Sequence, residues 1–178
     1  MSMIFTLVGV TPPQEQALRA DETLAGDLAI VVEGDEDESG RVSALGTIEP
    51  PLVLEKSWHI LHYAFTGEAE PTGSAGSMLL EGDEVGEDMG YGPPRLLNPQ
   101  STNAFADFLA QQTVEGLQAR VRYAAMKTAG IYGLPMGGGD DARYEDAIRR
   151  EIAASFPLLR DYVVATAARK NGLLLWLA

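Results

Sequence analysis

The sequence predicts an α+β fold: a single domain over residues 1–178, in which a small sheet including the N- and C-terminal strands is packed by several helices. Residues 3–10 and 173–177 are almost wholly apolar, as strands covered on both faces are. Most of the chain between them has helical spacing, without the regular strand–helix alternation of α/β folds. With 178 residues, 46% of them hydrophobic, the chain suits one domain with a sizeable core.

Local signals place the elements that follow the first strand. Residues 11–13, Thr-Pro-Pro, are an N-cap with proline in the first turn and begin a helix of about ten residues. A second short helix starts at Asp21 or Thr23. Residues 28–32 either end it or form a strand, because periodicity alone does not distinguish the two. Residues 33–38 hold five acids, which predicts a solvated loop; the spacing does not match an EF-hand calcium loop.

The clearest amphipathic helix is predicted over residues 54–66, between Pro50-Pro51 and Gly67. Its apolar side chains recur at i, i+4, i+7 and i+11, the spacing of one helical stripe. We expect this stripe to face the core; it consists of Leu54, Trp58, Leu61 and Phe65.

The C-terminal half contains further strand and helix signals. Residues 95–97 suggest a short strand, and Asn98-Pro99 caps a helix to about Gln111. Thr113 caps a helix that Gly130 ends, and Asp140 or Asp141 caps one through about Ala154. Pro157 starts or kinks a helix that runs to Lys170. The glycines at 137–139 are a turn, because no phosphate-loop Gly-Lys-Ser/Thr follows them.

A polar sector flanks the apolar stripe of helix 54–66. Glu55 and His59 are four residues apart, and His59 and His62 are three apart, so the three share one sector. They can be read as ligands for zinc or iron, or as a general base (His59) oriented by Glu55. The alternative that we favour is a structural flank in which His62 hydrogen-bonds a loop. A closed metal site needs a further ligand that the sequence does not place, so we expect no metal and no cofactor.

A glycine-rich segment at 86–95 is the second marked stretch. It does not lead from a strand into a helix, so it is not a dinucleotide fingerprint. We expect its glycines to permit a tight loop that lays Tyr91 and Arg95 against helix 54–66, with Glu87 or Asp88 paired to Arg95. No complete catalytic set is visible. A ligand pocket between helix and loop would be lined by Glu55, Trp58, His59, His62, Asp88, Tyr91 and Arg95.

Net charge narrows the choice of partner. The formal charge is −13, from 26 acidic and 13 basic residues, which disfavours binding to nucleic acid. Such a charge serves solubility first, and it also suits a basic protein partner. The chain has no cysteine, no apolar run long enough to cross a membrane and no basic leader, so we expect a cytoplasmic protein without disulfides.

Several of these motifs resemble those of the YfbM-like family, a bacterial domain of unknown function. The likeness rests on residues 56–67 (Lys-Ser-Trp-His-x-x-His-Tyr-x-x-Thr-Gly), 85–97, the opening Met-Ser-Met-Ile, and 159–175. It implies an α+β domain in the bacterial cytoplasm and implies no activity. Gly133 departs from the pattern, since family members tend to have proline after the equivalent of Ile131-Tyr132.

Two functional hypotheses follow. The first is a non-enzymatic binding or interaction module, with a basic protein as the partner that the acidic composition suits. The second is an enzyme or a protein that binds a small ligand or metal in the pocket described above. The sequence leaves the ligand and the oligomeric state open.

Overall fold

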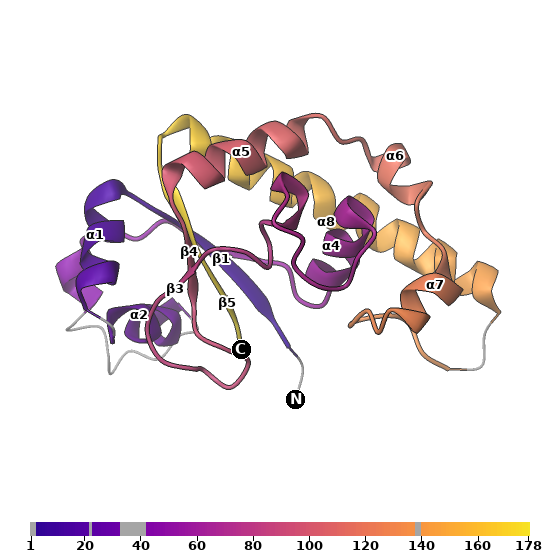
Figure 1. Cartoon of the computed structure of the whole chain (residues 1–178), viewed down its shortest axis with the longest axis horizontal. Coiled ribbons are helices and arrows are strands. Elements are labelled where there is room, and N and C mark those ends of the chain that lie inside the picture. The colour runs from indigo at the N-terminus through magenta and orange to yellow at the C-terminus, as the bar shows by residue number, and fades with distance from the viewer. Residues whose placement is uncertain (1–2, 22, 33–41, 138–139) are drawn as a thin grey trace.

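The middle of the structure is an antiparallel sheet with strand order β2-β1-β5-β4-β3 (Figure 1). A computed structural model describes residues 3–21, 23–32, 42–137 and 140–178. The strands of the sheet are β1 (Phe5–Val10), β2 (Leu52–Val53), β3 (Asp83–Glu84), β4 (Arg95–Leu97) and β5 (Gly172–Leu177). The two chain ends therefore supply neighbouring strands at the centre of the sheet, which confirms the predicted α+β architecture.

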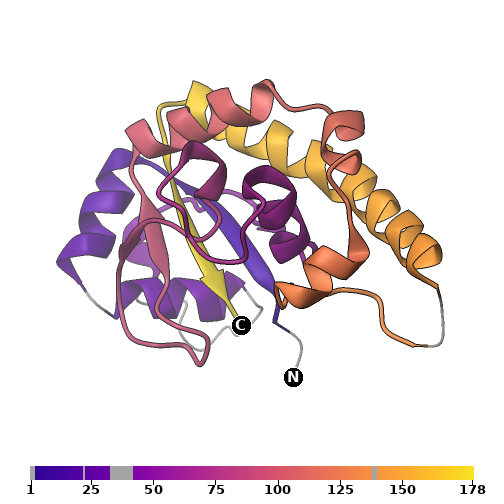
Figure 2. The same ribbon diagram turned by 45° about the vertical axis from the view of Figure 1, so that its right-hand side comes forward.

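Helices cover both faces of the sheet, as Figures 1 and 2 show. On one face, α1 (Pro12–Ala20) and α2 (Leu24–Val32) enclose a core with alternate residues of β1 and β5, such as Val8 and Leu174. On the other face, Leu7 and Leu175 belong to a larger core under the remaining helices. These are α4 (Ser57–Thr66), α5 (Pro99–Ala110), α6 (Val114–Gln118), α7 (Tyr123–Thr128) and α8 (Asp141–Ala168). Two short 3₁₀ turns, η1 (Ser43–Leu45) and η2 (Ala75–Ser77), also lie between elements, and Leu45 of η1 belongs to the core under α1 and α2.

Four of the predicted helix starts are confirmed by their side-chain caps. The side chains of Thr11, Asn98, Thr113 and Asp140 each accept a hydrogen bond from a main-chain N–H of the first turn that follows. Residues 28–32, which periodicity left open, continue α2 as helix.

Three predicted helices have different limits. Helix α4 begins at Ser57 because Glu55 has φ +47°, yet all four residues of the apolar stripe are buried. The helix predicted over 113–130 is two short helices, since Arg122 is extended. There Tyr123 donates its main-chain N–H to the Glu145 carboxylate. Helix α8 continues through Pro157, whose neighbour Phe156 is fully buried.

Two features predicted from the sequence lie wholly or partly outside the residues that the structure describes. The acidic loop at 33–38 and two of the three glycines at 137–139 lie outside the described residues. Among the helices of the described residues, none is long and apolar enough to span a membrane.

Candidate functional site

Helix α4 holds both histidines of the chain against neighbouring main chain. The Nδ1 atom of His59 lies 2.9 Å from the main-chain nitrogen of Tyr132, and its Nε2 lies 3.0 Å from the carbonyl oxygen of Ala69. A main-chain N–H only donates and a carbonyl only accepts, so His59 carries its proton on Nε2 and is neutral. Burial lowers its pKa, which agrees with this assignment. Both ring nitrogens of His59 are therefore engaged in holding the main chain.

His62 makes one bond of the same kind, one turn further along α4. It is fully buried, and its Nε2 lies 3.1 Å from the carbonyl oxygen of Glu70. Its Nδ1 is buried and has no hydrogen-bond partner among the described residues. Burial, as the largest cause, also lowers the pKa of His62, and the adjacent His59 acts in the same direction. The two rings thus fasten residues 69–70 to α4, which is the structural flank that the sequence analysis favoured.

The sector shared by Glu55, His59 and His62 is not maintained in the structure. Glu55 precedes the helix, is exposed, and lines a hollow with Ile148 and Glu151. No hydrogen bond joins it to His59 among the described residues. Within those residues, no three His, Asp or Glu side chains are placed to hold a metal ion. The prediction that Glu55 orients His59 as a general base is therefore wrong.

The loop between β3 and β4 faces α2 rather than α4. Val85 and Met89 pack in the core under α1 and α2, and Glu87 to Met89 line a hollow with α2. The Asp88 carboxylate accepts hydrogen bonds from the main-chain nitrogens of Gly90 and Gly92, which fixes the tight turn. The predicted pocket between helix 54–66 and this loop is therefore absent, because the sheet lies between the two.

Arg95 also differs from the expected ion pair. Its guanidinium donates to the carbonyl oxygens of Leu80 (2.9 Å) and Leu79 (3.3 Å), not to Glu87 or Asp88. Burial lowers the pKa of Arg95, while the negative charges of Glu84 and Glu81 act in the opposite direction. Arg95 thus ties β4 to the segment that precedes β3, and Tyr91, on the loop before it, is exposed.

A groove on the α4 side of the sheet was not predicted. We call it the aromatic groove, and its volume is about 710 Å³. The adjoining hollow at Glu55 is a separate space of about 410 Å³. Trp58 and His59 form one wall, with stacked rings 4.6 Å apart, and Tyr132 stacks on Trp58 at 6.2 Å. Its remaining lining residues are Met3, Lys56, Tyr123, Lys127, Gly130, Ile131, Gly133, Leu134 and Met136. The sequence analysis had singled out Trp58 and His59 as pocket residues and Ile131-Tyr132 in the resemblance, but it did not predict that these segments lie together.

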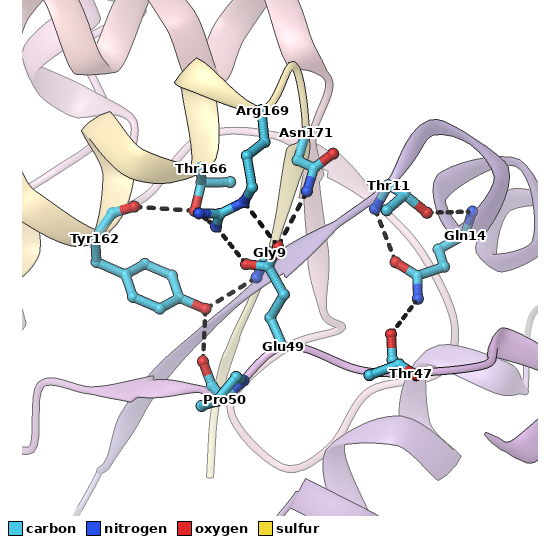
Figure 3. A network of polar contacts seen from close by, with 10 residues as sticks. All are labelled: Gly9, Thr11, Gln14, Thr47, Glu49, Pro50, Tyr162, Thr166, Arg169 and Asn171. Carbon is cyan, nitrogen blue, oxygen red and sulfur yellow. Dashed lines mark hydrogen bonds and ion pairs between the residues drawn. The ribbon is translucent and has the colours of Figure 1, made fainter.

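A polar network links the end of α8 to the segment before β2, as Figure 3 shows. The Glu49 carboxylate accepts hydrogen bonds from Arg169 (2.6 and 3.0 Å) and from the side-chain amide of Asn171 (3.1 Å). The Tyr162 hydroxyl accepts from the main-chain nitrogen of Gly9 and donates to the carbonyl of Pro50. Burial raises the pKa of Tyr162, so it stays protonated. Since its partners lie more than 100 residues apart, spacing in the sequence does not reveal this network.

The same segment is held at its other end by α1. The Gln14 side-chain amide donates to the carbonyl oxygens of Leu45 and Thr47. Its oxygen accepts from the main-chain nitrogen of Thr11, and Figure 3 draws this contact and the one to Thr47. The polar groups of both clusters find their partners within the fold. Tyr162 and Gln14 bind main-chain groups, and Glu49 binds the side chains of Arg169 and Asn171. This is the pattern of structural rather than reactive groups.

These features define a class of α+β protein in which the two chain ends pair at the centre of one sheet and a histidine-bearing helix fastens the loop after it. The chain belongs to the family described as a domain of unknown function, DUF1877, whose model matches residues 1–176. Among solved structures it is similar to YfbM from Escherichia coli, a protein of unknown function. That match has 15% identity and a TM-score of 0.66, and covers 98% of this chain and 99% of YfbM.

These findings confirm the YfbM-like resemblance. At this identity, the structural likeness shows the fold alone. A comparison with curated proteins gives no match.

Proposed function

We propose that this protein is a non-enzymatic binding module of the bacterial cytoplasm, which docks a basic protein partner through an acidic face. We define the acidic face by α2 and the β3–β4 loop, and in particular by Asp27, Ile30, Glu84, residues 87–89 and Tyr91. The observation that carries the proposal is the combination of exposed apolar side chains and carboxylates at this face.

The apolar part of the face is partly open to solvent. A hollow of about 300 Å³ lies between α2 and the loop, lined in part by Ile30 and Met89. Ile30 is 38% exposed, and Tyr91 on the same loop is 40% exposed. Tyrosine is enriched where proteins bind each other, because it offers a large contact area with few rotatable bonds.

Carboxylates surround these side chains. Glu84, Glu87 and Asp88 are exposed on the hairpin, and the five acids of residues 33–38 directly follow α2 in the sequence. Arg19, which contacts this hairpin, is already paired with Asp83 at 2.9 Å and with Glu15 at 3.0 Å. A surface of this kind attracts a positively charged partner and accelerates its association.

The histidines support binding over catalysis. The sequence offered His59 as a candidate general base, but His59 uses both ring nitrogens on main-chain groups, and the neighbouring His62 is fully buried. A general base must reach the proton that it abstracts, and neither ring is free to do so.

Replacing Glu87 by lysine tests the proposal. The tagged protein is used to purify its partner from native lysate, and the identified partner is then titrated against purified variants by calorimetry at low salt. We expect Glu87→Lys and Tyr91→Ala each to weaken binding by about tenfold, the first by charge and the second by lost contact area.

The matched control is Glu68→Lys, which changes the net charge equally on the loop that follows α4. It should leave the affinity within about twofold of the unmodified protein, since the effect of one exposed charge is local in salt. Recovery of no stoichiometric partner, or equal losses for Glu68→Lys and Glu87→Lys, would reject the acidic face as the binding site.

A further inference from the structure

The aromatic groove has the size and lining of a small-molecule site. Its volume is about 710 Å³, within the range of roughly 300–1,000 Å³ typical of ligand pockets. Trp58, Tyr123 and Tyr132 supply aromatic surface, and Leu134 and Met136 add aliphatic surface. Met136 is 91% exposed, so the groove is open to solvent at this point.

The groove is built from main-chain bonds that hold its walls in place. The Tyr132 hydroxyl accepts a hydrogen bond from the main-chain nitrogen of Met3 (2.9 Å), and His59 holds the main chain of Tyr132. The Tyr123 hydroxyl donates to the carbonyl oxygen of Pro135 (3.1 Å). A ligand entering this groove therefore meets a preformed surface and does not have to order it.

Four basic side chains that have no partner among the described residues lie around the groove. Lys56 and Lys127 line it, and a second hollow of about 340 Å³, which shares Met136 with it, is lined by Arg143 and Arg150. The side chains of these four bases make no hydrogen bond or ion pair with any described residue. By contrast, Arg149, beside them on α8, is paired with Glu145 and Asp146.

The carboxylates nearby are occupied or lie outside these two hollows. Glu145 and Asp146 hold Arg149, and Asp140 caps α8 by accepting from the main-chain nitrogen of Arg143. Glu55 and Glu151 line the adjoining hollow, which shares Lys56 and Gly133 with the groove. Neither the groove nor the hollow at Arg143 has a carboxylate in its lining. In a protein of net charge −13, this is a local concentration of unpaired positive charge.

We propose that the aromatic groove binds a small organic anion with a flat apolar body. The body would lie against Tyr132 and the ring of His59, which is stacked on the buried Trp58. The anionic group would be held by Lys127, with Arg143 and Arg150 available to a longer ligand. Aromatic walls favour a flat apolar body, and an unpaired ammonium gains a charge-assisted hydrogen bond when the anion arrives. This site is separate from the acidic face, because α2 and α4 cover opposite faces of the sheet.

The test uses 1-anilinonaphthalene-8-sulfonate, an aromatic sulfonate, and N-phenyl-1-naphthylamine, which has the same rings without the sulfonate. Both are titrated by fluorescence against the folded protein, with circular dichroism as a check of folding. We expect saturable binding of the sulfonate, weakened at least fivefold by Lys127→Gln. The uncharged amine should bind both proteins within twofold of each other.

Lys170→Gln is the matched control, because Lys170 is a lysine at the end of α8 that does not line the groove. It should change neither affinity by more than twofold. The proposal is overturned if the sulfonate fails to bind at millimolar concentration. It is equally overturned if Lys127→Gln and Lys170→Gln have the same effect, or if Lys127→Gln weakens the uncharged probe as much as the charged one.

Discussion

Gly172→Ala is expected to lower the free energy of unfolding by about 3 kcal/mol, because the new methyl group has no room in the centre of the sheet. A Cβ at residue 172 would lie 2.5 Å from the carbonyl oxygen of Leu97, a main-chain atom of β4. Strand β5 pairs with β1 on one side and β4 on the other, so it has no free edge toward which to move. Urea denaturation followed by circular dichroism measures the loss.

Gly26→Ala is the matched control for this substitution. Gly26 lies in α2, and a Cβ there meets no atom within 4 Å. The same chemical change should be neutral or should stabilise the protein by up to about 1 kcal/mol, since alanine is the better helix former. Equal stability of Gly172→Ala and the unmodified protein would show that β4 and β5 are not packed as closely as described.

Gly133→Ala is the second substitution with a large expected effect. Gly133 has φ +81°, and a Cβ there would lie 2.6 Å from the carbonyl oxygen of Lys56. The variant combines left-handed backbone strain with a main-chain clash, for an expected loss of about 3 kcal/mol. Because Gly133 lines the aromatic groove, the displaced segment should also weaken binding of the sulfonate probe.

Gly130→Ala separates the two causes of this loss. Gly130 has φ +75° but no atom within 4 Å of an added Cβ, so its substitution carries the backbone cost alone, about 1 kcal/mol. Denaturation curves of the two variants, measured side by side, should differ by about 2 kcal/mol. If the two losses are equal, the close approach of Lys56 to Gly133 does not contribute to stability.

The conformation of Gly133 also explains why this chain departs from the family pattern. Proline fixes φ near −65°, so the proline expected after Ile131-Tyr132 is incompatible with φ +81° at this position. The departure is visible in the sequence, but the left-handed backbone at residue 133 is visible only in the structure.

Features determined by local chemistry were predicted well. The cap residues Thr11 and Asn98 act on N–H groups three residues away, and the apolar runs of β1 and β5 are buried on both faces. The break at Arg122 and the continuity of α8 through Pro157 were missed. Both depend on partners from elsewhere in the fold, such as the Glu145 carboxylate that accepts from Tyr123.

In the candidate site too, features set by local spacing were predicted and features set by distant contacts were not. Helical spacing correctly placed Trp58 in the core and identified the two histidines on its flank. It gave no information on the position of the β3–β4 loop, because the sheet pairing determines which face that loop covers. The contact between His59 and Tyr132 spans 73 residues, so the aromatic groove became visible only in the structure.

The central claim is that His59 and His62 are neutral structural groups, and nitrogen-15 NMR of the histidine rings tests it most directly. Burial lowers both pKa values, so at pH 6.5, where a free histidine is about half protonated, the folded rings should be protonated to a smaller extent. We predict that both rings carry the proton on Nε2 at this pH, and that equimolar Zn²⁺ leaves their signals unchanged. Half-protonation near pH 6.5, a proton on Nδ1 of His59, or a zinc-induced shift of either ring would contradict the account.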